Sequence, residues 1–279
     1  MTDQKIPDRV FARAAQDAIN AKNAISTPQT ESPSYKLAFQ DNAFLLREDL
    51  RPVRFQLELL KPELLLDEAK IASTLVMYGS ARIPAPGVPA SNPDPAIAAR
   101  LEANARYYDE ARALSRTASQ TPRDEDGNRN FVVCSGGGPS IMEAANRGAQ
   151  DVGAESIGLN IVLPHEQAPN SYVTPSLSFQ FHYFALRKMH FLLRARAVAV
   201  FPGGFGTFDE TFELLTLIQT GKIKPMPVML FGKAFWNRVV NFDALVEEGV
   251  ISPKDLDLFT FVETADEAWA CIQRFYKAP

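Results

Sequence analysis

The sequence predicts an α/β fold in which helices cover both faces of a parallel sheet. Short apolar runs such as Ala197–Phe201 contain no polar residue, which is typical of strands buried on both faces. Segments of ten or more residues with helical spacing separate these runs, and this alternation favours parallel strands. A chain of 279 residues with 46% hydrophobic and 22% charged residues suits one such domain with an extension.

The N-terminal part of the chain is predicted to be that extension. Residues 1–40 are polar and punctuated by proline and serine, so we expect a flexible or partly helical tail, with an alanine-rich helical segment at residues 10–24. Apolar residues at helical spacing predict helix over residues 42–70. Residues 41–279 are expected to form a single domain.

The periodic part of the chain starts near residue 72. Apolar runs predict strands at residues 72–78, 131–134, 156–162, 178–182, 197–201, 227–231 and 259–262. Helical spacing predicts helices at residues 95–117, 140–151, 183–196, from 207 onward, 235–248 and 265–276.

The composition disfavours several classes of protein. A net charge of −4 without a dense run of lysine or arginine argues against a nucleic-acid partner. No apolar stretch approaches the roughly 20 residues needed to cross a membrane, and the first residues lack the apolar core of a signal peptide. Cys134 and Cys271 have no metal-ligand spacing, so we expect a cytoplasmic protein without a metal site or a disulfide framework, with the Cys134 thiol packed in the core.

The most informative segment is the turn that follows the apolar run ending at Phe201. It contains Gly203, Gly204 and Gly206, and an amphipathic helix follows it, with Thr207 predicted as the N-cap. Such a turn can present backbone N–H groups at the positive end of a helix, where a phosphate binds well. Glu210 lies in the first turn of that helix, so the segment predicts a phosphate site beside a carboxylate.

Two further turns follow predicted strands at the same edge of the sheet. One contains Gly79 and Ser80, and the other contains Gly136, Gly137 and Gly138. Ligands of open parallel sheets bind at the carboxyl edge of the strands. Each turn alone is equally well explained as a tight connection, but their common position favours one shared pocket.

The glycine-rich turns match no established nucleotide fingerprint. No glycine is followed at Walker spacing by Gly-Lys-Ser or Gly-Lys-Thr, and Ile141 stands where the third glycine of a dinucleotide motif would be. NAD is therefore disfavoured, and no cofactor is expected.

The segment before the glycine-rich turn carries candidate cations. Arg187 precedes Glu210 by one helix and one strand, so it could reach the same pocket, and Lys188 follows it directly. Such a pair is more often an exposed feature of a helix, but a phosphate site beside a carboxylate needs a cation.

Three features together resemble the Lonely Guy family: Arg187-Lys188, the Pro-Gly-Gly-x-Gly-Thr-x-x-Glu pattern of residues 202–210, and the turn at residues 135–138. Members of this family are phosphoribohydrolases that release cytokinin bases from riboside 5′-monophosphates, and they are often mislabelled as lysine decarboxylases. The resemblance covers roughly residues 70–275. The long segment before Ala72, and Pro139–Glu143 in place of Gly-Leu-Met-Gly, suggest a longer, bacterial subtype.

The resemblance implies a modified Rossmann fold for the nucleotide-binding catalytic domain and assembly as a dimer or higher homo-oligomer. It implies that Arg187 and Glu210 are catalytic. The phosphate-binding loop would comprise Gly203, Gly204, Gly206 and Thr207.

Cleavage of an N-glycosidic bond passes through an oxocarbenium-like sugar, which a carboxylate such as Glu210 can stabilise. Glu143 could contact the sugar or base, or it could simply stabilise the positive N-terminal end of its helix. His182 is a candidate for positioning Arg187. The alternative function is a non-catalytic nucleotide or cofactor carrier. A decarboxylase would need a lysine to hold pyridoxal phosphate, and Lys188 is the only lysine expected near the glycine-rich turns.

Overall fold

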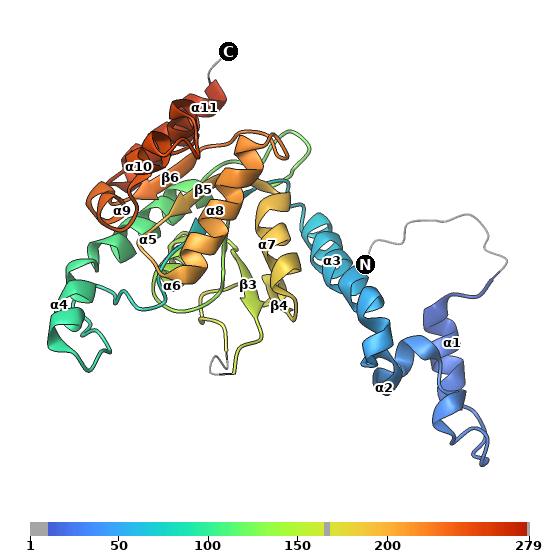
Figure 1. Ribbon diagram of the computed structural model, residues 1–279. Coiled ribbons are helices and arrows are strands. Elements are labelled where there is room, and N and C mark those ends of the chain that lie inside the picture. The colour runs from blue at the N-terminus through green and yellow to red at the C-terminus, as the bar shows by residue number, and fades with distance from the viewer. Residues whose placement is uncertain (1–10, 165–167, 278–279) are drawn as a thin grey trace. The chain divides into compact units, whose positions relative to one another are not determined.

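The computed structural model describes residues 11–164 and 168–277 and divides the chain into two compact units, Met1–Leu57 and Glu58–Pro279 (Figure 1). The first unit contains α1 (Ala14–Lys22), α2 (Asn42–Leu45) and the start of α3 (Arg51–Glu68). Single 3-10 turns lie at Pro33–Tyr35, Ala38–Gln40 and Glu48–Leu50. The predicted start of the first helix at residue 10 lies outside the described residues, and the helix predicted over residues 42–70 is interrupted between α2 and α3.

The second unit is built on a seven-stranded parallel sheet with the order β4-β3-β2-β1-β5-β6-β7. The strands are β1 (Thr74–Tyr78), β2 (Val132–Ser135), β3 (Ile157–Ile161), β4 (Ser178–Phe181), β5 (Ala195–Val200), β6 (Val228–Phe231) and β7 (Thr260–Val262). Each corresponds to a predicted strand, so the predicted α/β class with a parallel sheet is confirmed.

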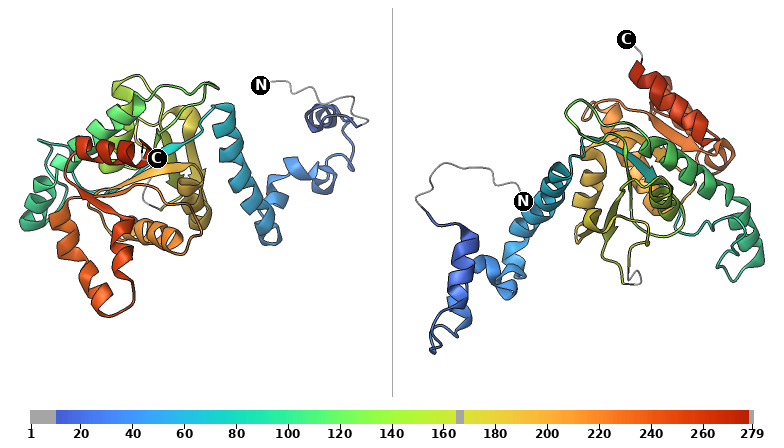
Figure 2. Two further views of the ribbon diagram at one scale, coloured as in Figure 1. Left: turned by 90° about the horizontal axis from the view of Figure 1, so that it is seen from above. Right: turned by 180° about the vertical axis from the view of Figure 1, so that it is seen from behind.

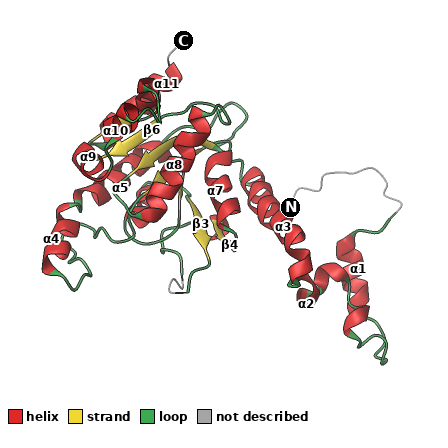
Figure 3. Ribbon diagram, viewed as in Figure 1, coloured by secondary structure: helices red, strands yellow, loops and turns green. Residues whose placement is uncertain are grey.

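Helices cover both faces of this sheet, as the secondary-structure colouring of Figure 3 shows. They are α4 (Pro95–Ala103), α5 (Arg106–Ser119), α6 (Ile141–Asp151), α7 (Phe184–Leu193), α8 (Phe205–Gln219), α9 (Lys233–Val239), α10 (Phe242–Glu247) and α11 (Ala265–Lys277), with 3-10 turns at Pro175–Leu177 and Pro253–Leu258. Figure 1 shows α7 and α8 in front of the sheet, and the reverse view in Figure 2 shows α5 and α11 on the other side, where α6 packs against α5. No helix of the described residues is long and apolar enough to cross a membrane.

The chain order creates a topological switch point beside the central strand. The chain first builds outward from β1 to β4, then returns through α7 to place β5 on the opposite side of β1. Val76 is in register with Val198, and Tyr78 with Val200, so both strands end at the same level. Such a switch point opens a crevice outside the carboxyl ends of the two strands.

The core is a continuous apolar layer on the α5–α6–α11 side of the sheet. Leu75, Met77 and Ala199 are fully buried in the central strands, and Leu114 of α5 packs in the same cluster. Burial of apolar side chains on both faces explains why the runs 75–77 of β1 and 197–200 of β5 contain no polar residue.

Three further predicted helices differ from the structure. The helix expected over residues 95–117 breaks at Asn104, because α4 has no buried residue whereas α5 buries Tyr107 and Tyr108. The helix expected over residues 235–248 breaks before α10, where the Asn241 side chain accepts a hydrogen bond from the Ala244 N–H at 3.1 Å. The helix expected to reach residue 196 ends at Leu193, because β5 already starts at Ala195.

Candidate active site

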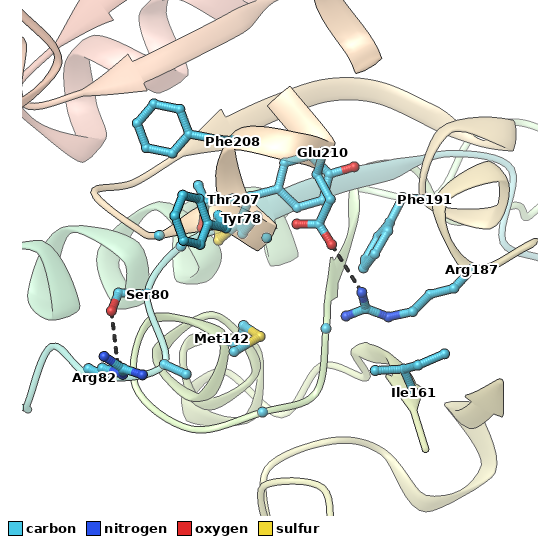
Figure 4. A pocket seen from close by; sticks show the side chains of 18 of the residues that line it. Tyr78, Ser80, Arg82, Met142, Ile161, Arg187, Phe191, Thr207, Phe208 and Glu210 are labelled. Atoms are coloured by element: carbon cyan, nitrogen blue, oxygen red, sulfur yellow. Dashed lines mark hydrogen bonds and ion pairs between the residues drawn. The ribbon is translucent and has the colours of Figure 1, made fainter. Parts of the chain in front are cut away.

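A cavity of about 800 Å³ lies at the switch point, outside the carboxyl ends of β1 and β5 (Figure 4). It is lined by residues from six helices and strands and the loops between them. They are Met77, Tyr78, Gly79, Ser80, Ala81, Arg82, Gly136, Gly138, Met142, Ile161, Leu163, Phe184, Arg187, Phe191, Gly204, Phe205, Gly206, Thr207, Phe208, Glu210 and Val239.

The cavity contains a buried ion pair that joins α7 to α8. An Arg187 Nη1–H donates to Glu210 Oε1 at 3.0 Å, and only 10% of the Arg187 side chain and 13% of the Glu210 side chain are exposed. Arg187 also donates from Nε to the Leu159 carbonyl at 2.7 Å and lies over the ring of Phe191. These contacts hold the guanidinium from three directions, so the carboxylate of Glu210 has a rigid partner.

Burial dominates the protonation of Glu210. It raises the pKa of this carboxyl to about 7, because the loss of water outweighs the attraction of the Arg187 guanidinium, and the nearby Asp209 charge adds to the rise. Burial and the Glu210 charge raise the pKa of Tyr78 well above its usual value, so its hydroxyl keeps its proton. Glu210 is therefore the acidic group of this cavity that titrates near neutral pH.

The N-terminus of α8 opens into the same cavity. Gly204 is its N-cap, and the helix starts at Phe205, so the prediction of Thr207 as N-cap was wrong. Thr207 is buried against Gly203 instead: a Cβ on Gly203 would lie 2.1 Å from Thr207 Oγ1. A Cβ on Gly206 would meet nothing within 4 Å, so the first turn faces open space with its free N–H groups.

The turn after β1 is joined to this helix start. Phe201 N–H donates to the Tyr78 carbonyl at 2.8 Å, and Ser80 N–H donates to the Pro202 carbonyl at 3.0 Å. Gly79 is required by close packing, since a Cβ there would lie 2.5 Å from Ile141 Cγ2. The two glycine turns therefore form one wall of the cavity.

The turn after β2 forms the wall on the Arg187 side. A Cβ on Gly136 would lie 2.6 Å from Arg187 Nη2, so only glycine leaves room for the guanidinium. Gly137 has a φ of +73° and packs against Asn160, while Gly138 lines the cavity beside Met142. The predicted meeting of all three turns at one edge agrees with this geometry.

Gly137 and Gly203 do not line the cavity themselves, and three candidate side chains lie away from it. The Lys188 ammonium pairs with Asp209 at 3.2 Å and with Glu213 on α8. Glu143 accepts a hydrogen bond from the Tyr108 hydroxyl at 2.7 Å, and the His182 side chain is exposed while its backbone N–H donates to Glu58.

Several residues that line the cavity were not predicted from the sequence. Arg82 lies two residues after Ser80, and this position close to a glycine turn is the signal that could have identified it. Tyr78 ends a predicted strand, whereas Met142, Ile161 and Phe191 belong to apolar patterns that look like ordinary core. Their exposure to the cavity follows from the order of the strands, which the sequence pattern does not encode.

Neither Cys134 nor Cys271 lines the cavity. Cys134 is buried, and burial raises the pKa of its thiol far above its usual value, in agreement with a packing role. Within residues 11–164 and 168–277, no group of three or more histidine, cysteine, aspartate or glutamate side chains could hold a metal ion.

The fold and the site define a Rossmann-like α/β protein with a buried Arg–Glu pair beside a glycine-rich helix start. A family model described as "Possible lysine decarboxylase" matches residues 142–272. The cytokinin riboside 5′-monophosphate phosphoribohydrolase LOG3 of Arabidopsis thaliana is 30% identical over 145 residues, which is 50% of this chain and 66% of the relative. The enzyme named LOG4 from the same plant is 29% identical over 144 residues, 50% of this chain and 65% of its own length.

The chain is thus similar to the Lonely Guy family. It spans slightly less than two thirds of the length of these relatives, and the match covers half of its own residues.

Solved structures also resemble the chain. The molybdenum cofactor binding protein from Rippkaea orientalis has a TM-score of 0.46 and 15% identity, over 74% of this chain and 98% of that one. The Moco carrier protein from Chlamydomonas reinhardtii has a TM-score of 0.44 and 17% identity, over 73% of this chain and 98% of that one.

Proposed function

We propose that the protein hydrolyses the N-glycosidic bond of nucleoside 5′-monophosphates such as AMP, cytokinin nucleotides included, and releases the free base and ribose 5-phosphate. The observation that carries this proposal is the buried Arg187–Glu210 pair in the same cavity as the start of α8. The similarity to a phosphoribohydrolase of the Lonely Guy family supports the same chemistry.

The start of α8 would bind the phosphate. Gly204, Phe205, Gly206 and Thr207 line the cavity, and the first N–H groups of a helix have no partner within the helix. Together with the helix dipole they favour an anion. Binding energy from the phosphate would then position the sugar.

Glu210 would act on the sugar. As the bond to the base breaks, positive charge develops at C1′ and the ring oxygen, and a carboxylate nearby stabilises it. Arg187 would hold this carboxylate in place, because its own position is set by Leu159 and Phe191. Water would then add to C1′, and Glu210 is suited to orient it.

The base would lie against the apolar wall of the cavity. Met142, Ile161, Phe184 and Phe191 provide flat or flexible apolar surface there. This wall is compatible with adenine and with adenine that carries an apolar substituent.

The test is to incubate the protein with AMP and to separate the products by chromatography. We expect free adenine and ribose 5-phosphate in equal amounts, and a panel of nucleoside monophosphates would rank the bases. A carrier would instead bind AMP and return it intact. A decarboxylase is disfavoured, because no lysine lies among the described residues that line the cavity to hold pyridoxal phosphate.

We further propose that the protein is a homo-oligomer, as the resemblance to the Lonely Guy family implies, and that it is cytoplasmic, as its composition suggests. Light scattering coupled to size exclusion would measure the mass of the particle against the 30.8 kDa of one chain.

A further inference from the structure

Arg82 is the charged residue of the cavity that the mechanism above leaves without a role. Charged side chains among the described residues that line the cavity are Arg82, Arg187 and Glu210. Arg187 is paired with Glu210, whereas the Arg82 side chain is exposed and has no carboxylate within ion-pair distance among the described residues. Arg82 therefore brings a positive charge to the cavity that no carboxylate of the described residues compensates.

The backbone on both sides of Arg82 is held in place. Its N–H donates to the Ser80 hydroxyl at 2.9 Å, and Ser80 in turn donates its N–H to the Pro202 carbonyl at 3.0 Å. On the other side, Ile83 is buried and its carbonyl accepts a hydrogen bond from the Ser140 hydroxyl. An exposed arginine on a constrained backbone is ready to meet a ligand with little loss of backbone entropy.

These bonds also place Arg82 close to the start of α8. Pro202 directly precedes Gly203, so two hydrogen bonds connect the Arg82 backbone to the glycine turn. Figure 4 shows Ser80 and Arg82 on the same side of the cavity as Thr207, opposite Arg187. The free guanidinium and the free N–H groups of the helix therefore belong to the same part of the cavity.

We propose that Arg82 binds the 5′-phosphate and sets the preference for phosphorylated over unphosphorylated nucleosides. This inference rests on the proposed function. The helix start supplies partial charges, while a phosphate monoester carries close to two negative charges near neutral pH, which a guanidinium can meet with two parallel hydrogen bonds. Arg82 would be a binding residue that determines specificity and would take no part in bond cleavage.

The experiment compares Arg82→Gln and Arg82→Lys with the wild type on AMP and on adenosine. We expect Arg82→Gln to lower kcat/KM for AMP by roughly 10- to 100-fold, the usual effect of losing a hydrogen bond to a charged group, and to leave adenosine within about threefold. Arg82→Lys should recover part of the loss on AMP, because it keeps the charge. Arg116→Gln is the matched control, since Arg116 is an exposed arginine on α5 away from the cavity.

Calorimetric binding of AMP and adenosine separates this inference from the proposed function. Wild-type protein that binds AMP without releasing adenine would contradict the hydrolase, while a selective loss of AMP affinity in Arg82→Gln would still support the role of Arg82. Three results would overturn the role of Arg82. Arg82→Gln could lose equal affinity for AMP and adenosine, or it could keep the wild-type preference for AMP while melting at the wild-type temperature. The wild type could also bind AMP and adenosine equally well.

Discussion

Glu210 is a buried side chain that we propose acts through its negative charge, and a single substitution can remove the charge while keeping the side chain in place. Glu210→Gln keeps the size and the hydrogen-bonding capacity of the side chain but removes the charge that would stabilise the developing oxocarbenium. We expect base release from AMP to be lost, with AMP affinity within several-fold of the wild type, because the charge matters most in the transition state. Chromatographic turnover and calorimetric binding measure the two effects, and near-normal turnover would remove Glu210 from the mechanism.

Arg187 and Glu210 are expected to act as one unit, because they share a hydrogen bond of 3.0 Å and both side chains are largely buried. Arg187→Ala should therefore reduce turnover severely, and the double variant with Glu210→Gln should be little worse than either single variant. Strictly additive losses in kcat would show that the two side chains act in separate steps.

The protonation of Glu210 predicts a pH profile. Because the carboxylate is the active form and its pKa is raised to about 7, kcat/KM for AMP should rise with pH through about 7. The Asp209 charge contributes to that rise in pKa, so Asp209→Asn should move the midpoint to lower pH. The ionisation of the AMP phosphate is the same for both proteins, so the difference between the two profiles reports on Glu210. Coincident midpoints, or a shift to higher pH in the variant, would contradict the assignment.

At the scale of elements, the glycine before α8 and the glycine in its first turn have different roles. Gly203→Ala would force Thr207 to move, because the new Cβ would lie 2.1 Å from Thr207 Oγ1, so we expect a lower melting temperature and lower activity. Gly206→Ala meets no atom within 4 Å and favours helix, so we expect an equal or higher melting temperature. Its methyl group would nevertheless occupy the space proposed for the phosphate.

Gly206→Ala should therefore lose AMP turnover without losing stability, whereas Gly203→Ala should lose both. Thermal denaturation followed by circular dichroism, together with an AMP assay, measures the pair. Full activity in Gly206→Ala would show that the phosphate lies elsewhere.

Much of the element order was predictable because the strands here are apolar runs bounded by turn residues. The helix breaks at Asn104 and before Asn241 were not, since each depends on which helix finds a surface to pack on. The site was predictable where glycines or the Arg187–Glu210 spacing mark it. Arg82 and Ile161 were not, because the sequence pattern does not encode the strand order, which places the loop after β1 and the end of β3 at one cavity.

At the scale of the whole molecule, the sheet and every residue that lines the cavity belong to the second compact unit. In the first unit, α1 contains no buried residue. We therefore expect that deletion of residues 1–35 leaves a folded protein whose kcat/KM for AMP is within several-fold of the full chain. An insoluble product, or a large fall in the melting temperature, would show that these residues stabilise the rest of the chain.

The central claim is that a phosphate bound at the start of α8 positions a sugar against Glu210, and the most direct measurement compares kcat/KM for AMP and adenosine on the same preparation. A charge-assisted hydrogen bond contributes about 1.5–3 kcal/mol, and each roughly 1.4 kcal/mol is a factor of ten. Two such bonds predict that AMP is cleaved to adenine and ribose 5-phosphate at least about a hundredfold more efficiently than adenosine. Equal efficiency on AMP and adenosine would contradict the claim, whatever the effect of replacing Glu210.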